Sequence, residues 1–234
     1  MDHVAIKKSI FKSQHCQRNW DLTQEMPEDD LDTLMIAATQ CPSKQNIAFY
    51  KLHFVTNRDL IERIHGHTKG FVMKHGETRD KTEYTTNAQV LANLLIVFEE
   101  YLDLSKAQDA GRNEQVIDLV NGTAKDSDLK LIEKDRMMAI GVAAGYLNLT
   151  ASLMGYATGC CTCFMPREVQ KEMGIKGRPL LLMGIGIADK GRNRRMHQIE
   201  DFMFPTKSKQ PIPVEWINLS LIHISEPTRR YAIS

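Results

Sequence analysis

Residues 134–158 read KDRMMAIGVAAGYLNLTASLMGYAT, the longest periodic segment of the chain. Apolar side chains recur on one face at helical spacing, and small residues between them would let a second helix approach closely. The apolar face consists of Ile140, Ala144, Leu147, Ala151 and Met154. The small residues are Ala139, Gly141, Ala143, Gly145 and Ser152. The pattern predicts a long helix against which another helix can pack.

The segments around this helix predict a sheet and further helices. Residues 90–100 (VLANLLIVFEE) and 179–188 (PLLLMGIGIA) are continuous apolar runs, typical of strands buried on both faces. Residues 50–56 (YKLHFVT) alternate like a strand with one buried face. Shorter helices are expected at residues 26–40, 58–67 and 167–175. We expect the polar residues 103–128 to form a mobile excursion.

The composition suits one domain and excludes some classes of partner. The chain has 234 residues, 42% hydrophobic and 25% charged, with a formal net charge of +1. Balanced charge argues against bulk nucleic-acid binding and against polybasic attachment to a membrane. No apolar run reaches the roughly 20 residues that span a bilayer, and the first residues lack the apolar core of a secretory signal. The odd count of five cysteines does not suit a disulfide framework, so we expect a cytoplasmic protein.

The last residues differ from the rest of the chain. Residues 219–229 (LSLIHISEPTR) resemble the translation of a sequencing adapter. We therefore expect the domain to comprise residues 1–218 and residues 219–234 to be a non-native tail. The alternative is a genuine C-terminal strand at residues 219–224.

Two early motifs carry groups that could bind a ligand. In residues 41–46 (CPSKQN) a helix ends and polar groups follow, which could hydrogen-bond the edges of a flat heterocycle or simply form a turn. In residues 15–21 (HCQRNWD), Arg18 could pair with a phosphate through its guanidinium group. The alternative is a solvated arginine beside a buried Trp20.

Two later motifs are equally open on their own. Lys207 and Lys209 would point the same way in an extended segment, making an anion site or a solvated basic patch. Residues 155–164 (GYATGCCTCF) hold three cysteines within four residues, too close together to surround one tetrahedral metal ion. We expect no metal there, but a loop of small residues packed against a ligand, in which one thiol could be reactive.

The order of these segments resembles that of the nitroreductase family over nearly the whole chain up to about residue 218. The series runs from a basic motif through a helix, Pro-Ser-x-x-Asn, two strands, a long small-residue helix, a glycine-rich loop and another strand to a basic pair before an extended arm. The resemblance implies an α+β fold with a central mixed sheet flanked by helices. It also implies a domain-swapped homodimer that holds FMN at its interface, the alternative being a monomer with a buried central helix.

The resemblance also assigns roles to single residues. Arg18 would hold the FMN phosphate, although Gln14 and Cys16 stand where the family has an arginine and a serine. Asn87 or Gln89 would reach the pyrimidine edge of the flavin. The loop against the flavin ring and ribityl chain would comprise Pro42, Ser43, Lys44 and Asn46. Backbone amides near N5 and the dimethylbenzene side would come from Cys160, Cys161, Thr162 and Cys163. The C-terminal phosphate pair would be Lys207 and Lys209, with Arg194 and Arg195 as competing ligands.

The function implied is an FMN-dependent oxidoreductase that uses NADH or NADPH to reduce a nitroaromatic, a quinone or a related acceptor by a ping-pong mechanism. No residue is expected to be a dedicated catalytic acid or base. Residues 69–87 and 104–128 would form lids, with Phe71, Met73 and Tyr84 lining a substrate pocket. The alternatives are a flavin-binding relative with little turnover (flavin storage or fragmentation), a dehalogenating reductase, or a metal-binding module built on Cys160–Cys163.

Overall fold

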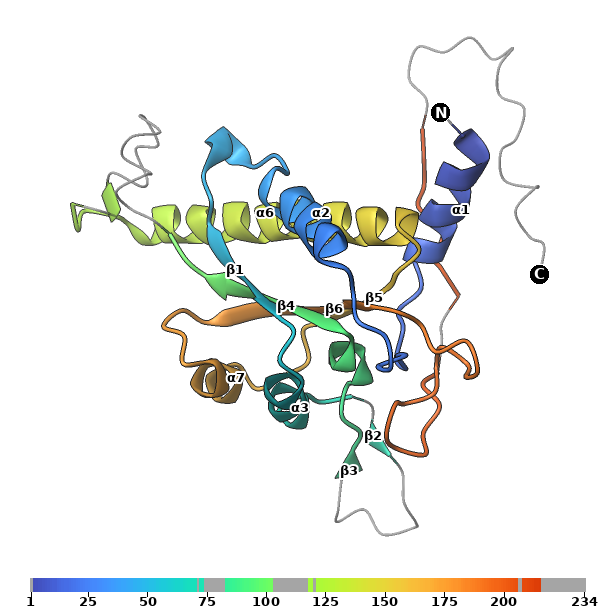
Figure 1. The fold of residues 1–234 in the computed structure, drawn as a ribbon. Coiled ribbons are helices and arrows are strands. Elements are labelled where there is room, and N and C mark those ends of the chain that lie inside the picture. Colours follow the sequence, from blue (N-terminus) through green and yellow to red (C-terminus); the bar gives the residue numbers. More distant parts are fainter. Residues whose placement is uncertain are drawn as a thin grey trace, which may run out of the picture.

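The computed structural model describes residues 2–70, 72–73, 83–102, 118–119, 121–205 and 208–215. A four-stranded sheet lies at the centre of these residues, and helices cover both of its faces (Figure 1). The expected α+β class and the sheet flanked by helices are confirmed.

The sheet is built around two central strands that are buried on both faces. Its strands are, in spatial order, β1 (Tyr50–Val55), β4 (Leu94–Glu100), β6 (Pro179–Gly186) and β5 (Ala157–Cys161). All three pairings between them are antiparallel, which corrects the expected mixed sheet. A continuous apolar run is compatible with either direction of pairing, so the sequence pattern could not decide it. Among the described residues a parallel contact occurs at one isolated bridge, between Cys16 and Thr158.

Two helices pack on one face of the sheet. They are α2 (Glu28–Thr39) and α6 (Asp126–Leu153). Three acidic residues in the first turn of α2 favour the positive end of its dipole. The segment expected to be helical from residue 134 begins about two turns earlier, at Asp126. Asp128 caps this start by accepting a hydrogen bond from the Lys125 N–H at 2.9 Å. At 28 residues α6 is about 42 Å long.

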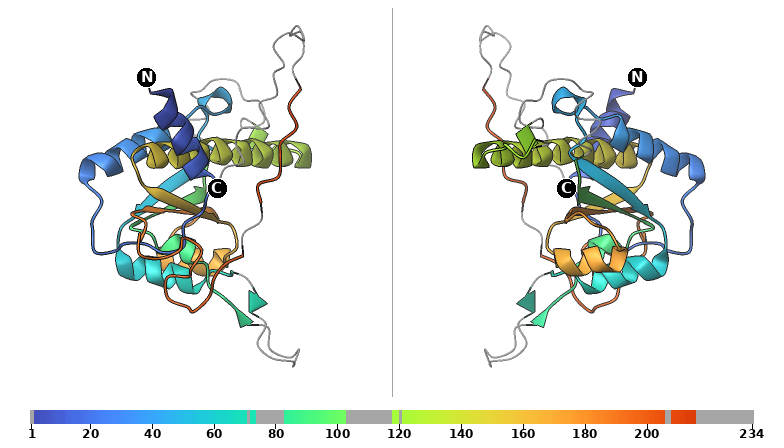
Figure 2. Two further views of the ribbon diagram at one scale, coloured as in Figure 1. Left: turned by 90° about the vertical axis from the view of Figure 1, so that its right-hand side faces the viewer. Right: turned by 90° about the vertical axis from the view of Figure 1, so that its left-hand side faces the viewer.

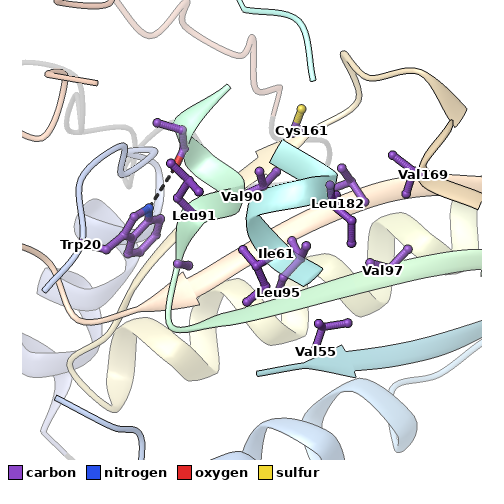
Figure 3. Close-up of a cluster of buried hydrophobic side chains, with 13 residues drawn as sticks. Trp20, Val55, Ile61, Val90, Leu91, Leu95, Val97, Cys161, Val169 and Leu182 are labelled. Carbon is purple, nitrogen blue, oxygen red and sulfur yellow. Dashed lines mark hydrogen bonds between the residues drawn. The ribbon is translucent and has the colours of Figure 1, made fainter. Parts of the chain in front are cut away.

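The opposite face is covered by α3 (Arg58–Gly66), α7 (Pro166–Met173) and the short 3₁₀ helix η2 (Ala88–Leu91). Asn57 caps the start of α3 through the Leu60 N–H at 2.9 Å. The apolar side chains of these elements meet β4 and β6 in a buried cluster (Figure 3). Trp20 joins this cluster and donates from its indole N–H to the Ala88 carbonyl at 2.9 Å. We expected residues 90–93 to begin a strand, but they form the end of η2 and the bend that follows it, and β4 begins at Leu94.

The first helix, α1 (His3–Ser13), was not anticipated from the sequence, and it packs on the C-terminal end of α6. Three hydrogen bonds join the two regions: Lys12 Nζ to the Gly155 carbonyl at 2.6 Å, Ser152 Oγ to the Ser9 carbonyl at 2.9 Å, and Asn148 Nδ2 to the Ser13 carbonyl at 2.9 Å. The chain leaving α1 then runs past β5.

Residues 188–205 wrap back against the chain that follows α1. Asn19 donates to the carbonyls of Asn193 and Met196 at 2.6 and 3.0 Å, and Trp20 bridges to Ala188. Residues 208–215 are exposed and rise past α6 as an extended segment (Figure 2).

The two expected lids and the expected C-terminal tail lie largely outside the described residues. In the first expected lid, β2 (Val72–Met73) pairs with β3 (Glu83–Tyr84), and residues 74–82 between them lie outside the described ones, as does Phe71. Most of the second lid and the tail at residues 219–234 also lie outside them. None of the described helices is long and apolar enough to cross a membrane.

Candidate functional site

Two guanidinium groups meet at the backbone carbonyl of Cys16. Arg194 Nη1 lies 3.3 Å from this oxygen, and Arg18 Nη1 lies at the longer distance of 3.5 Å. No ion pair with a carboxylate occurs for either arginine among the described residues, and the Arg18 Nε is buried without a partner. Burial lowers the pKa of Arg18, and the positive charge of Arg194 acts in the same direction. Two close cations with unused donors form a site that an anion would stabilise.

The structure separates the four candidates for the second phosphate ligand. Arg194 lies beside Arg18, whereas Arg195 is turned to the Met203 sulfur at 3.2 Å. Lys209 is exposed, and Lys207 lies outside the described residues. The pairing of Arg18 with Arg194 depends on the return of residues 188–205 to the N-terminal segment, which no local pattern reveals. The assignment to Lys207 and Lys209 stays a prediction.

Beyond these arginines, η2 lies directly on β5. A Cβ atom on Gly159 would meet the Gln89 Cβ at 2.8 Å, so the glycine is what permits this contact. Both polar atoms of the Asn87 amide have a partner, since Nδ2 donates to the Cys161 sulfur at 3.1 Å and Oδ1 accepts from the Gln89 N–H at 3.2 Å. Gln89 is only 5% exposed, and its side-chain amide makes no hydrogen bond to the described residues. Of the two candidates for the pyrimidine edge, Gln89 therefore has the free amide.

The cysteine segment begins inside β5 and continues into the loop after it. Cys161 is buried, whereas Cys160, Thr162 and Cys163 are exposed. Burial raises the pKa of Cys161 to about 12, so this thiol is protonated at neutral pH. Among the described residues, no cluster of three or more histidine, cysteine, aspartate or glutamate side chains is suited to a metal ion.

The Pro-Ser-x-x-Asn loop is fastened to α6. The Lys44 ammonium pairs with the buried Asp135 carboxylate at 2.6 Å, which anchors the loop to the helix. Gln45 and Asn46 both have a φ of 55°, in the left-handed region that few residues other than glycine adopt. Pro42 and Asn46 are exposed and Ser43 is half-buried.

Within one chain, the predicted site falls into two separate parts. The loop contacts α6 at Asp135. The segment that leads to Arg18 is joined to α6 near Asn148 through Thr158, whose hydroxyl donates to Asn148 Oδ1 and whose carbonyl accepts from the Gln17 N–H. Thirteen helical residues at 1.5 Å each place these points about 20 Å apart. Arg18, Gln89 and Cys160–Cys163 thus share one region, and the loop at residues 42–46 lies in another.

Comparison with known proteins places this geometry in a family. No curated protein matches the chain in sequence. Three solved structures with the same fold are each 15% identical to it. A Bacillus subtilis protein described as a nitroreductase has a TM-score of 0.63, with 92% of this chain and 100% of that chain covered. For a Staphylococcus epidermidis protein described as an NAD(P)H:FMN oxidoreductase, the TM-score is 0.58 and the coverage 91% and 95%.

The third is an Exiguobacterium sibiricum protein, described as a nitroreductase and solved in complex with FMN. Its TM-score is 0.57, with 93% and 98% of the two chains covered. At these identities the likeness shows the fold, which confirms the expected nitroreductase-like architecture. The model of the nitroreductase family matches residues 12–187. Because this match spans most of the sequence, the chain belongs to the nitroreductase family.

Proposed function

We propose that the protein is an FMN-dependent oxidoreductase that takes electrons from NADH or NADPH and reduces a small-molecule acceptor such as a nitroaromatic or a quinone. The observation that carries the proposal is the pair of guanidinium groups of Arg18 and Arg194, close together and without a carboxylate partner among the described residues. Bound FMN would supply the hydride and electron transfer, first with the nicotinamide donor and then with the acceptor.

The described residues fit this cofactor at two points. Arg18 and Arg194 have the charge and the free donors that a phosphate needs, and the buried Arg18 Nε has no other partner. The Gln89 amide, with one donor group and one acceptor, suits the alternating donors and acceptors of a pyrimidine edge. A donor at that edge would stabilise negative charge on the reduced ring, as an oxyanion hole does.

A homodimer would join the two separate parts of the site. The outward surface of α6 is apolar, and no charged residue occurs between Arg136 and Arg167. Its exposed residues include Met137, Met138, Gly141, Val142, Gly145 and Tyr146. An exposed helix face without charges is typical of an interface.

The geometry of α6 also suggests how the two copies would pair. A two-fold axis near residues 141 and 142 would place the Asp135 end of one α6 beside the Asn148 end of the other. The loop at residues 42–46 of the second copy would then face the Arg18 region of the first. The exposed segment 208–215 could reach across in the same way, as a domain-swapped arm would.

The absorbance spectrum of the purified protein tests the proposal. We expect flavin absorbance that bleaches on anaerobic addition of NADH or NADPH and returns with a quinone or nitroaromatic acceptor. A colourless protein that does not bind FMN at micromolar concentration refutes it. A protein that binds FMN without steady NAD(P)H oxidation would instead be the flavin-storing or flavin-fragmenting relative.

Two variants locate the phosphate. Arg194→Ala should weaken FMN binding by about tenfold or more, because charge-assisted hydrogen bonds contribute roughly 1.5–3 kcal/mol. The double variant Lys207→Ala/Lys209→Ala tests the competing assignment. If the double variant loses FMN and Arg194→Ala does not, the phosphate lies at the C-terminal lysines.

A further inference from the structure

The side chain of Arg18 rests on an aromatic ring. Its Cζ atom lies 4.5 Å from the centroid of the Phe204 ring, within the range of a cation–π contact. Phe204 is only 1% exposed, and two other rings among the described residues contact it. The His197 ring stacks on it with centroids 5.8 Å apart and planes 20° apart, and the Phe202 ring meets it edge-on at 5.0 Å.

The histidine in this stack is itself locked in place. His197 is fully buried, and its Nδ1 accepts hydrogen bonds from the backbone N–H groups of Ile199 and Glu200 at 3.1 and 2.9 Å. Its Nδ1 therefore carries no hydrogen, and the hydrogen on Nε2 points to the Thr86 hydroxyl at 3.0 Å. Glu200 also accepts from the Thr86 N–H at 3.0 Å, so residues 197–204 are tied to the segment that leads into η2.

An aromatic support leaves the guanidinium group free for an incoming anion. A carboxylate partner would hold Arg18 equally well, but it would occupy the donors and cancel the charge that a phosphate needs. A phenylalanine ring attracts the cation through its face and accepts no strong hydrogen bond. The ring also restricts the long Arg18 side chain before the ligand binds, so less conformational entropy is lost on binding.

We propose that Phe204 is a positioning residue for the flavin phosphate, holding Arg18 by its ring face in the orientation that binds the anion. The proposal rests on the proposed FMN function and adds a residue that acts through Arg18. It predicts that Phe204 affects the binding of a flavin with a phosphate and not of one without it.

Titration of the apoprotein with FMN and with riboflavin, followed by flavin fluorescence, tests this prediction. Phe204→Leu should weaken FMN binding about tenfold, within the range of desolvated cation–π contacts, and leave riboflavin binding unchanged. Phe204→Met, which also removes the ring and has a flexible side chain that can fill an irregular gap, should do the same if the leucine variant folds poorly. The matched control is Phe98→Leu, the same change at a fully buried phenylalanine of β4 whose ring packs against Tyr50 in a separate cluster, which should keep the wild-type ratio of FMN to riboflavin affinity.

A double-mutant cycle separates positioning from general packing. In an Arg18→Ala background, Phe204→Leu should cause no further loss of FMN affinity, because its effect acts through Arg18. Equal losses for FMN and riboflavin, no loss for FMN, or a full additional loss in the Arg18→Ala background would overturn the proposal. If the wild-type protein binds neither flavin, the FMN function itself fails, which is a different result from any of these.

Discussion

Replacing Val142 by glutamate tests the proposed packing of two α6 helices. Val142 is 38% exposed on the outward surface of α6. Added Cβ atoms at the neighbouring Gly141 and Gly145 would meet nothing within 4 Å, so this surface of a single copy can accept a larger side chain without a clash. The change should leave the folded monomer intact, because surface substitutions usually alter stability by no more than about 0.5 kcal/mol.

In the dimer the same change is costly. A two-fold axis near residues 141 and 142 brings the two new carboxylates close together. At about 5 Å and an effective dielectric constant of about 20, their repulsion is about 3 kcal/mol. Each copy also loses the partial burial of a valine, about 1 kcal/mol. A loss of about 5 kcal/mol weakens association by a factor of several thousand.

Sedimentation velocity at micromolar concentration measures this effect. We expect wild-type protein at twice the chain mass of 26.6 kDa and Val142→Glu at the chain mass, with FMN retention reduced because the two parts of the site separate. Leu22→Glu is the control, since Leu22 is 40% exposed and lies in a loop, held by the Asn93 amide, that is remote from α6 in sequence. If Val142→Glu sediments like the wild type, or if the wild type sediments as a monomer throughout, the α6 dimer is refuted.

Three further predictions concern single buried groups. Gln89→Met should weaken FMN and riboflavin binding by a similar factor of about two to ten, since it removes hydrogen bonds worth about 0.5–1.5 kcal/mol from the ring and not from the phosphate; a loss confined to FMN would contradict the assignment. Burial, reinforced by His197, lowers the pKa of His65 to about 4 from its usual 6.5, so the unfolded chain takes up the proton first. Stability should therefore fall by up to about 3 kcal/mol as the pH drops from about 6.5 to about 4, and His65→Gln should remove this part of the slope in urea unfolding. Cys161, whose pKa burial raises to about 12, should be alkylated by iodoacetamide only after unfolding, and mass spectrometry showing early labelling would count against its buried position.

Periodicity and composition were sufficient for the main elements of the fold. The helix expected from residue 134 is α6, and the apolar runs at residues 94–100 and 179–186 are the central strands. These elements could be predicted because buried side chains recur at the period of the helix or strand that carries them. The order of these elements was also enough to identify the family, which the match over residues 12–187 confirms. Helix α1 was missed, since none of its residues is buried and its sequence carries no strong apolar period.

The site could be predicted only in outline. Sequence order proposed Lys207 and Lys209 for the phosphate, with Arg194 and Arg195 as competing ligands, and left Asn87 and Gln89 equivalent. The structure brings Arg194 to Arg18, joins the Asn87 amide to Cys161, and engages Lys44 in an ion pair with Asp135. Each of these outcomes depends on a contact between segments far apart in the chain.

The sequence by itself determined the class of fold, the long apolar helix and the kinds of chemical group available. Only the tertiary structure decided that the strands pair antiparallel and that Arg194 meets Arg18, which lies on the Phe204 ring. It also decided that the loop at residues 42–46 lies about 20 Å from them along α6. The physical reason is that periodicity reports which side of an element is buried, whereas a binding site depends on which distant side chains share one place, and that is set by packing.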